Sequence, residues 1–233
     1  MIEAEFWDYD TATELADAVA GDVGFIIESA LDARGDAVIA VPVDDVSMPI
    51  LEKLAKQKLN WKKVTLFPTD DRLVPVSDPL AKVTPLAKLF LPLGARVMPI
   101  GSDTKDYKSA GKAADARLQD LQWPCDLIWL SMGEDGHTAA IYAGPDLDEA
   151  LNGPKERRAL GIMPEPMPKD APVARVTLSR AAIASARSLM IVTKGDNRRE
   201  LLEQAIEDGT SSTLPIGRVL ADLEQPIDIH WCA

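Results

Sequence analysis

The sequence predicts an α/β fold, with an open, mainly parallel and doubly wound sheet that carries helices on both faces. Short apolar runs typical of buried strands alternate with helical patterns along almost the whole chain. No internal repeat, low-complexity tract or linker interrupts this alternation, so residues 1–233 are expected to form a single domain. A chain of 233 residues, 46% of them hydrophobic and 27% charged, has the composition of a globular protein with a sizeable core.

The first helix and the first strand have clear boundaries. Residues 11–14 (Thr-Ala-Thr-Glu) match a capping box, apolar residues then recur at helical spacing from Leu15 to Ala30, and Gly35 ends the pattern. The run Ala-Val-Ile-Ala-Val over residues 37–41 is apolar throughout, which is typical of a strand buried on both faces of a parallel sheet. This helix and strand begin the alternation that predicts the sheet.

The remaining elements follow the same alternation. Helices are expected over residues 47–58, 79–90, 106–121, 180–186 and 198–208, and strands over residues 63–67, 96–100, 126–130, 175–178, 188–193 and 227–231. The segment 146–172 is rich in proline, glycine and charge, so we expect a long loop with one short helix there. Loops of this size are often functional.

The charge balance and the cysteines exclude several classes of function. Lys and Arg number 25 against 37 Asp and Glu, a formal net charge of −12, which argues against binding to nucleic acid or an anionic membrane surface. The acidic N-terminus is unlike a signal peptide, and no apolar run approaches the ~18–20 residues of a membrane span. Cys125 and Cys232 stand apart from any cluster of metal ligands, so we expect no metal site and a cytoplasmic location.

Polar residues follow four of the predicted strands. In open α/β sheets, ligands bind beyond the carboxyl ends of the strands. The four strand exits are residues 42–47, 70–75, 133–138 and 194–198. Each of them alone can be explained as a connection between a strand and a helix, but all four are expected at the same end of the sheet. Their convergence favours a shared site.

The segment 133–137 (Gly-Glu-Asp-Gly-His) is the most informative of the four exits. Its two glycines allow a sharp turn, and an imidazole beside carboxylates can act as a general base whose tautomer one carboxylate fixes. The chain has two histidines, and the second, His230, lies on a predicted terminal strand, where a solvated residue or a hydrogen-bonded core residue is expected. His137 is therefore the candidate catalytic residue.

Four segments of the chain resemble those of the 6-phosphogluconolactonases and, more distantly, of the glucosamine-6-phosphate isomerase/deaminase group that shares their fold. Residues 126–140, DLIWLSMGEDGHTAA, are similar to the family segment DLVLLGMGxDGHTAS. Residues 70–75 resemble its DERxVP turn, residues 175–179 its RITLT strand, and residues 192–202 its VTGxxKxxxL turn and helix. Order and spacing hold over about residues 5–231, nearly the whole chain.

The resemblance implies hydrolysis of 6-phospho-glucono-1,5-lactone to 6-phosphogluconate in the pentose phosphate pathway, with no metal or organic cofactor. His137 would remove a proton from the attacking water, and Asp135 or Glu134 would orient or polarise the imidazole. Arg72 would lie among the anionic oxygens of the substrate, and Arg198 takes the place of a phosphate-binding lysine. The same motifs supply the other expected substrate-binding residues: Asp70, Asp71, Gly133, Gly136, Arg175 and Gly195.

The chain departs from the family most at the first strand exit. The family has a glycine-rich loop there, SGGSTP, which holds a phosphate at a helix N-terminus. Here residues 42–47 read Pro-Val-Asp-Asp-Val-Ser, so Asp44 and Asp45 are expected to contact the substrate instead. An aspartate there caps the helix, and losing two or three charge-assisted hydrogen bonds of roughly 1.5–3 kcal/mol would weaken phosphate binding by ~10²-fold or more. A second stretch, VPxxHxxSN in the family, has Asp78 in place of the histidine.

Three functions are compatible with this sequence. The first is phosphogluconolactonase activity. The second is hydrolysis of a lactone or another sugar derivative that lacks the 6-phosphate, since carboxylates at positions 44 and 45 suit hydroxyls or an amine better than phosphate. The third is a non-catalytic sugar-binding homologue. The expected partner is a small-molecule sugar lactone or sugar phosphate, bound by a monomer or homodimer, with no nucleic acid or membrane partner.

Overall fold

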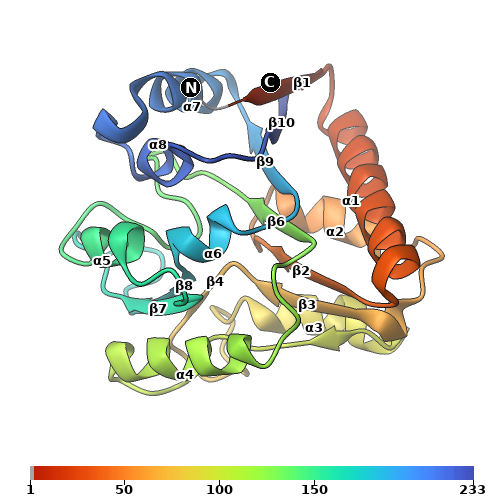
Figure 1. Cartoon of the computed structure of the whole chain (residues 1–233), viewed down its shortest axis with the longest axis horizontal. Helices are drawn as coiled ribbons and strands as arrows, with labels where there is room; N and C mark the ends of the chain where they lie inside the picture. Colours follow the sequence, from red (N-terminus) through yellow and green to blue (C-terminus); the bar gives the residue numbers. More distant parts are fainter. Residues whose placement is uncertain (1–2) are drawn as a thin grey trace.

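The computed structural model describes residues 3–233 and confirms the predicted fold class. Over these residues, a main sheet of seven strands has the order β1-β10-β9-β6-β2-β3-β5, and every neighbouring pair is parallel (Figure 1). Its strands are β1 (Ala4–Tyr9), β2 (Ala37–Val41), β3 (Val64–Pro68), β5 (Arg96–Val97), β6 (Leu127–Leu130), β9 (Leu189–Lys194) and β10 (Ile227–Cys232). The first and last strands of the chain therefore lie side by side at one edge.

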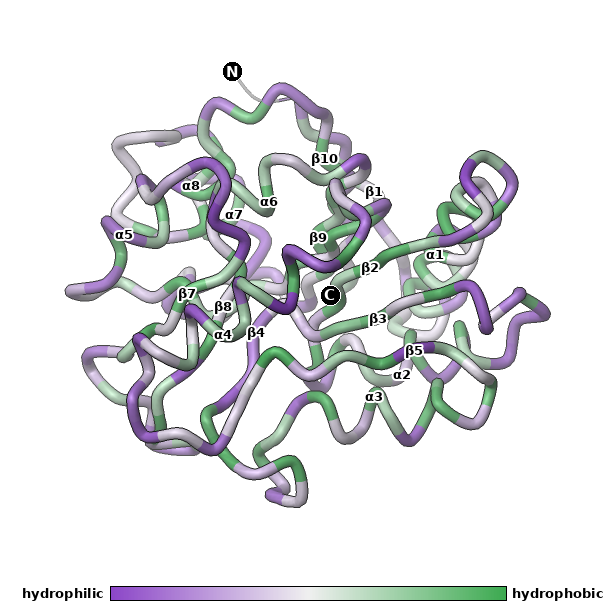
Figure 2. Tube along the Cα trace, turned by 60° about the horizontal axis from the view of Figure 1, so that its bottom comes forward, coloured by the Kyte–Doolittle hydropathy of each residue, from purple (hydrophilic) through white to green (hydrophobic). Residues whose placement is uncertain are grey.

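Helices cover both faces of this sheet (Figure 1). One face carries α1 (Ala12–Arg34), α2 (Ser47–Leu54) and α3 (Val83–Phe90), and the other carries α4 (Tyr107–Gln119), α5 (Leu147–Asn152), α6 (Arg180–Ala184), α7 (Asp196–Asp208) and α8 (Pro215–Leu220). Each face buries its own apolar cluster, and all of β2 is buried between the two. In Figure 2, β2 and β3 accordingly run through the molecule as largely hydrophobic segments. Burial on both faces explains why β2 is apolar throughout.

A second, antiparallel sheet was not predicted. It has the order β4-β8-β7, with β4 at Asp70–Arg72, β8 at Arg175–Leu178 and β7 at Ala159–Ile162. The strand expected over 175–178 is therefore confirmed but lies outside the main sheet. The segment 146–172 contains the expected short helix, α5, but it also contains β7 and so is not simply a loop. Gly161 allows β7 to contact α4 closely, because a Cβ there would lie 1.8 Å from the carbonyl oxygen of Tyr107.

Several boundaries differ from the prediction for local reasons. Helix α2 ends at Leu54 rather than at residue 58, and the strand expected over 96–100 is paired only over Arg96–Val97. Helix α3 begins at Val83 rather than at residue 79, which places Pro85 in its first turn, where a missing amide hydrogen is tolerated. Strand β1 and helix α8 were not predicted, because β1 is a half-exposed edge strand and α8 is only six residues long.

The caps of α1 lie where the sequence predicts them. The Thr11 hydroxyl accepts a hydrogen bond from the amide of Glu14 at 3.1 Å, which satisfies one of the free amides of the first turn. At the other end, Gly35 adopts the left-handed conformation with φ 81° and donates its amide to the carbonyl of Leu31. These two contacts fix the length of the helix that precedes β2.

His230 is a core residue, the second of the two alternatives expected for it. It is buried on β10, its Nδ1 lies 2.9 Å from the Tyr9 hydroxyl, and its ring stacks with those of Trp7 and Tyr9. Its Nε2 has no hydrogen-bond partner among residues 3–233, and the nearest carboxylate oxygen, from Asp22, is 3.9 Å away. Burial lowers the pKa of His230, and the nearby Asp22 opposes this shift only in part. This histidine is therefore held in its neutral form.

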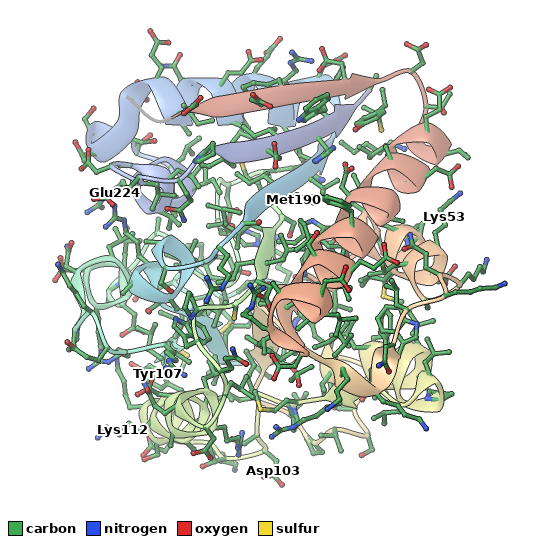
Figure 3. The ribbon with its side chains drawn as sticks, turned by 45° about the vertical axis from the view of Figure 1, so that its right-hand side comes forward. Lys53, Asp103, Tyr107, Lys112, Met190 and Glu224 are labelled. Atoms are coloured by element: carbon green, nitrogen blue, oxygen red, sulfur yellow. The ribbon has the colours of Figure 1, made fainter. Side chains whose placement is uncertain are left out.

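Most apolar side chains lie inside the molecule, and most charged side chains lie on its surface. Figure 3 shows Met190 on β9 inside the molecule, whereas Lys112 on α4 and Asp103 before α4 extend into solvent. Cys125 and Cys232 are both free thiols and both buried. Among the described residues, no helix combines the length and the apolar composition that crossing a bilayer requires.

Candidate active site

The four predicted strand exits meet at one cavity. They follow β2, β3, β6 and β9, which are neighbours in the main sheet, so their carboxyl ends lie along one edge. A cavity of about 1000 Å³ opens there, lined by residues of all four exits and by residues 165–170 of the segment predicted to be functional. The predicted site residues that line it are Asp44, Asp45, Asp70, Arg72, Gly133, Glu134, Asp135, His137, Arg175 and Arg198.

A tight turn after β6 carries His137. The amide of Gly133 donates to the carbonyl of His137 at 2.9 Å, and the amide of Gly136 donates to the carbonyl of Gly133 at 3.0 Å. Gly136 has φ 73°, and a Cβ there would lie 2.7 Å from the Cβ of Leu214, so only glycine fits. Gly136 does not line the cavity. Its position explains the shape of the turn rather than contact with a substrate.

Asp135 is the carboxylate that contacts the imidazole. Its Oδ1 lies 2.5 Å from His137 Nδ1 and also accepts the backbone amide of His137 at 3.1 Å. The hydrogen bond from the imidazole holds the pKa of Asp135 below its usual range, so this carboxylate is ionised. With the proton on Nδ1, the free lone pair of the ring is on Nε2. Glu134 instead has a largely exposed side chain, 3.8 Å from the Arg198 guanidinium.

Strand β4 directs alternate side chains to opposite sides. Asp70 and Arg72 line the cavity, whereas Asp71, between them, does not. The Asp71 carboxylate accepts the backbone amides of Arg72, Lys82 and Val83 at 2.8, 2.7 and 3.2 Å, so it fixes the segment that leads into α3. Burial raises the pKa of Asp71 despite these bonds. Asp71, predicted as substrate-binding, thus lies outside the cavity.

Asp70 is paired with a lysine at the base of the cavity. Its Oδ1 lies 2.6 Å from Lys82 Nζ, and both side chains are nearly buried. Burial alone would raise the pKa of Asp70, but the Lys82 ammonium, helped by the Arg72 guanidinium and by His137, holds this pKa below its ordinary value. Asp70 and Lys82 therefore form an ion pair near the imidazole, and their opposite charges neutralise each other.

Arg72 and Arg175 face each other across the antiparallel pair of β4 and β8. Arg175 is 2% exposed, and its guanidinium donates to the carbonyl oxygens of Ala171, at 2.8 Å, and Val173. Arg72 differs, because its Nε is buried without a hydrogen-bond partner in the described part of the chain. Two facing cations repel unless an anion lies between them or hydrogen bonds satisfy them. Of the two guanidinium groups, that of Arg175 is held by backbone carbonyls, whereas the Nε of Arg72 has no partner among the described residues.

In the loop after β2, side chains of the loop itself accept hydrogen bonds from its backbone amides. Asp44 Oδ1 accepts the amides of Val46 and Ser47 at 3.0 and 2.8 Å, and the Ser47 hydroxyl accepts the amide of Asp44 at 2.9 Å. These are the amides at the start of α2 that an anion would otherwise contact. The predicted capping by aspartate is confirmed, and the carboxylates of Asp44 and Asp45 line the cavity in place of an open amide nest.

Gly195 lies beside the cavity rather than on it. It precedes α7 with φ 92°, and its carbonyl accepts the indole Nε1–H of Trp231 at 3.0 Å. It lines a smaller neighbouring hollow of about 360 Å³ together with Glu134 and Arg198. Arg198 belongs to both hollows, so the first turn of α7 connects them.

Comparison with known proteins identifies the family. The family model described as glucosamine-6-phosphate isomerases/6-phosphogluconolactonase matches residues 10–231. The chain belongs to this family.

Individual members of the glucosamine-6-phosphate isomerase/6-phosphogluconolactonase family match over almost the whole chain. The chain is 32% identical over 225 residues to the 6-phosphogluconolactonase of Pseudomonas putida, which covers 95% of this chain and 90% of that protein. It is 30% identical over 227 residues to the 6-phosphogluconolactonase of Rhizobium meliloti strain 1021, with 96% of both chains covered. A crystal structure of a 6-phosphogluconolactonase from Shewanella baltica OS155 has the same fold, with a TM-score of 0.90, 24% identity and 99% and 98% of the two chains covered.

The residues that line the cavity of this family member without having been predicted include Lys82, Tyr142 and Lys169. Lys82 falls in the stretch that differs from the family motif, and Tyr142 lies five residues after His137. For both residues, the position in the sequence could therefore have indicated a place in the site. Lys169 lies in the segment 146–172, whose length and composition indicated a functional loop but did not single out this residue. Within residues 3–233, no group of three or more His, Cys, Asp or Glu side chains is arranged to hold a metal ion.

Proposed function

We propose that this chain hydrolyses 6-phospho-glucono-1,5-lactone to 6-phosphogluconate, a reaction of the pentose phosphate pathway, with water activated by His137. The observation that carries the proposal is the 2.5 Å contact between His137 Nδ1 and Asp135 Oδ1 on the wall of the cavity. Family membership supports the substrate, because the relatives from P. putida and R. meliloti are named 6-phosphogluconolactonases.

The reaction requires a base, a positioned water and a route for one proton. Water attacks C1 of the lactone while Nε2 of His137 takes a proton from it, and the ionised Asp135 stabilises the imidazolium that forms. The bond between C1 and the ring oxygen then breaks, and the imidazolium returns its proton to that oxygen. The products are a free hydroxyl and a carboxylic acid, which loses its proton to solvent. A lactone carbonyl is already electrophilic, so positioning supplies much of the acceleration.

The 6-phosphate is assigned to side chains rather than to backbone amides. Among the cations of the cavity, Lys82 is paired with Asp70 and Arg175 donates to two backbone carbonyls. The remaining cations are Arg72, Lys169 and Arg198. Arginine suits a phosphate because its planar guanidinium can donate two parallel hydrogen bonds. The carboxylates of the β2 loop are left to accept hydrogen bonds from the sugar hydroxyls.

A lactone without the 6-phosphate is the second candidate substrate, and the Asp44 turn favours it. The amides that a family member would offer to a phosphate are occupied here by Asp44, and Asp45 adds a second negative charge at the same place. Both carboxylates disfavour a nearby phosphate and accept hydrogen bonds from neutral hydroxyls. This candidate keeps the same base and the same reaction at C1.

The test compares the hydrolysis rates of two lactones, each measured with two forms of the protein. Ring opening of 6-phospho-glucono-1,5-lactone and of glucono-1,5-lactone is measured with the wild-type chain and with His137→Gln, each corrected for spontaneous opening in buffer. The proposal expects hydrolysis of the phosphorylated lactone well above the buffer rate and its loss in the variant. Preference for glucono-1,5-lactone would establish the second candidate. Buffer rates with both lactones would contradict both and support a non-catalytic sugar-binding protein.

We also propose a cytoplasmic location, as the pathway assignment requires. Cys125 and Cys232 are both buried thiols without a disulfide, which suits a reducing compartment. Fractionation of the native cells, followed by detection of the chain with an antibody, tests this directly, and recovery in the secreted fraction would contradict it.

A further inference from the structure

We infer that Tyr142 is a positioning residue for His137: its ring stacks on the imidazole and holds it against Asp135, so that Nε2 is the ring nitrogen left for the cavity. The inference rests on the proposed function where activity is the readout. It concerns the turn after β6, in which the backbone of Gly133, the carboxylate of Asp135 and the Tyr142 ring each contact the same imidazole.

The stacking geometry is close to parallel. The centroids of the His137 and Tyr142 rings are 4.3 Å apart and their planes differ by 20°. Aromatic rings at such distances attract each other beyond the area that they bury. Tyr142 also lines the cavity, so the pair forms part of its wall. A side chain of this size beside the imidazole restricts the rotation of the imidazole about its χ angles.

The imidazole is also packed tightly against the backbone. A Cβ built on Gly133 would lie 2.2 Å from Cε1 and 2.3 Å from Nδ1 of His137, so any side chain at position 133 would displace the ring. The Asp135 carboxylate is 2.5 Å from Nδ1. Hydrogen bonding alone leaves a histidine ring free to pivot about that bond, whereas stacking fixes its plane. Tyr142 therefore supplies the constraint that Asp135 cannot.

The Tyr142 ring is in turn held by its surroundings. Burial raises the pKa of the Tyr142 hydroxyl, and the Arg175 guanidinium beside it acts in the opposite direction. Arg175 is itself fixed by the carbonyls of Ala171 and Val173. The raised pKa means that the phenol of Tyr142 is protonated, so the ring beside the imidazole is uncharged.

The chain contains a matched control for this arrangement. His230 also stacks with a tyrosine, Tyr9, at a centroid distance of 5.9 Å and an angle of 13°. That pair lies between β1 and β10, at an edge of the main sheet and outside the cavity. Removing the Tyr9 side chain therefore takes away a neighbouring ring, together with the 2.9 Å contact between its hydroxyl and His230 Nδ1, without touching the proposed base.

The experiment replaces each tyrosine and follows both histidines. Aromatic pairs of this kind contribute about 0.5–1.5 kcal/mol, so Tyr142→Leu is expected to lower kcat about 2- to 13-fold. KM should change less than about twofold, since a positioning residue acts on the reacting group. Tyr142→Phe keeps the ring and should recover most of the loss. Tyr9→Leu should leave kcat unchanged.

A second readout does not depend on activity. Long-range ¹H–¹⁵N spectra report the tautomer of each histidine, and the chain has only two. Wild-type His137 should show a single tautomer with the proton on Nδ1. In Tyr142→Leu the unstacked ring can turn away from Asp135 and lose the hydrogen bond that fixes the tautomer, so a mixture is expected. The His230 signals should stay unchanged in that variant and should change in Tyr9→Leu. If Tyr142→Leu does not fold, Tyr142→Met, which fills the space without a ring, carries the same expectation.

The outcomes separate the two proposals. A wild-type chain without lactonase activity would contradict the proposed function, but the spectra of the Tyr142 variants would still decide the positioning role. An unchanged His137 tautomer in Tyr142→Leu, with kcat within twofold of wild type, would overturn the inference. An equal loss of kcat in Tyr142→Phe and Tyr142→Leu would also overturn it, because the hydroxyl and not the stacked ring would then be the group that matters.

Discussion

The turn after β6 (residues 133–138) and the loop after β2 (residues 42–47) follow neighbouring strands, and each contains an aspartate that accepts short hydrogen bonds. The two aspartates accept these hydrogen bonds from different kinds of donor. Asp135 accepts a hydrogen bond from an imidazole and so orients that side chain, whereas Asp44 accepts hydrogen bonds from the amides of its own loop. The same residue type thus prepares one turn for chemistry and closes the other to anions.

The difference follows from the path of the backbone in each of the two turns. Gly136 allows the β6 turn to fold back until Gly133 bonds His137, which brings the imidazole over the Asp135 carboxylate. The β2 loop enters α2 directly, so its first free amides point at the nearest acceptor, which is Asp44. Under the proposed function, the site therefore keeps a candidate base at His137 while the amides at the start of α2 are occupied by Asp44.

Removing the base should have the largest effect. His137→Gln keeps a polar side chain of similar reach but cannot take a proton, so kcat for the phosphorylated lactone should fall by ~10²–10⁴-fold. Initial rates corrected for spontaneous opening measure this, and an unchanged melting temperature shows that the fold is intact. A loss smaller than tenfold would mean that the β6 turn does not supply the base.

The two carboxylates of the β6 turn should differ in effect. A charge-assisted hydrogen bond of about 1.5–3 kcal/mol corresponds to roughly 10- to 150-fold in rate, so Asp135→Asn should lower kcat within that range. Glu134→Gln is the matched control, because its carboxylate is 3.8 Å from Arg198 and does not contact the imidazole. Its kcat should stay close to that of the wild type. Similar losses in both variants would contradict the assignment of Asp135.

Reopening the β2 loop should improve phosphate binding. Replacing residues 43–46 with Gly-Gly-Ser-Thr frees the amides that Asp44 occupies and removes two negative charges. One regained charge-assisted hydrogen bond is enough to lower KM for the phosphorylated lactone by about tenfold. KM for glucono-1,5-lactone serves as the control and should not fall. An unchanged KM for the phosphorylated lactone would show that the phosphate lies elsewhere in the cavity.

The smallest effect concerns the second histidine and the pH dependence of stability. Burial lowers the pKa of His230 below its usual 6.5, so between these two values the unfolded chain binds a proton that the folded chain does not. The contribution of His230 is therefore complete above about pH 6.5 and decreases as the pH falls toward the lower pKa of the folded state. Melting curves from pH 7.5 to 5 should show Tm falling less steeply in His230→Phe than in the wild type. Parallel curves would contradict a buried neutral imidazole.

Local patterns predicted the main sheet well and the small sheet poorly. The apolar run of β2 and the glycines around His137 are signals that lie within a few residues of the feature that they specify. Strands β4 and β7 are short, and each is stabilised by pairing with β8, which is distant from β4 in the chain. Such pairing depends on tertiary contacts that a short run of residues does not encode.

The same distinction holds within the site. The pairing of His137 with a carboxylate was expected, but the choice between Asp135 and Glu134 needed the geometry of the turn. Asp71 was expected beside Asp70 on the substrate, and it lies outside the cavity because residues 70–72 form a strand whose side chains alternate. The stacking of Tyr142 on His137 had no sequence signal beyond their spacing.

The close contact of β7 with α4 has a mechanical consequence. At Gly161 and at Gly111 a Cβ would collide with the opposing backbone, so the two elements touch without side chains between them and cannot slide past each other. Residues 165–170 extend from the end of this stiff unit to form one side of the cavity. The side of the cavity formed by residues 165–170 therefore begins next to a strand that is held against α4 by direct backbone contact rather than by interlocking side chains.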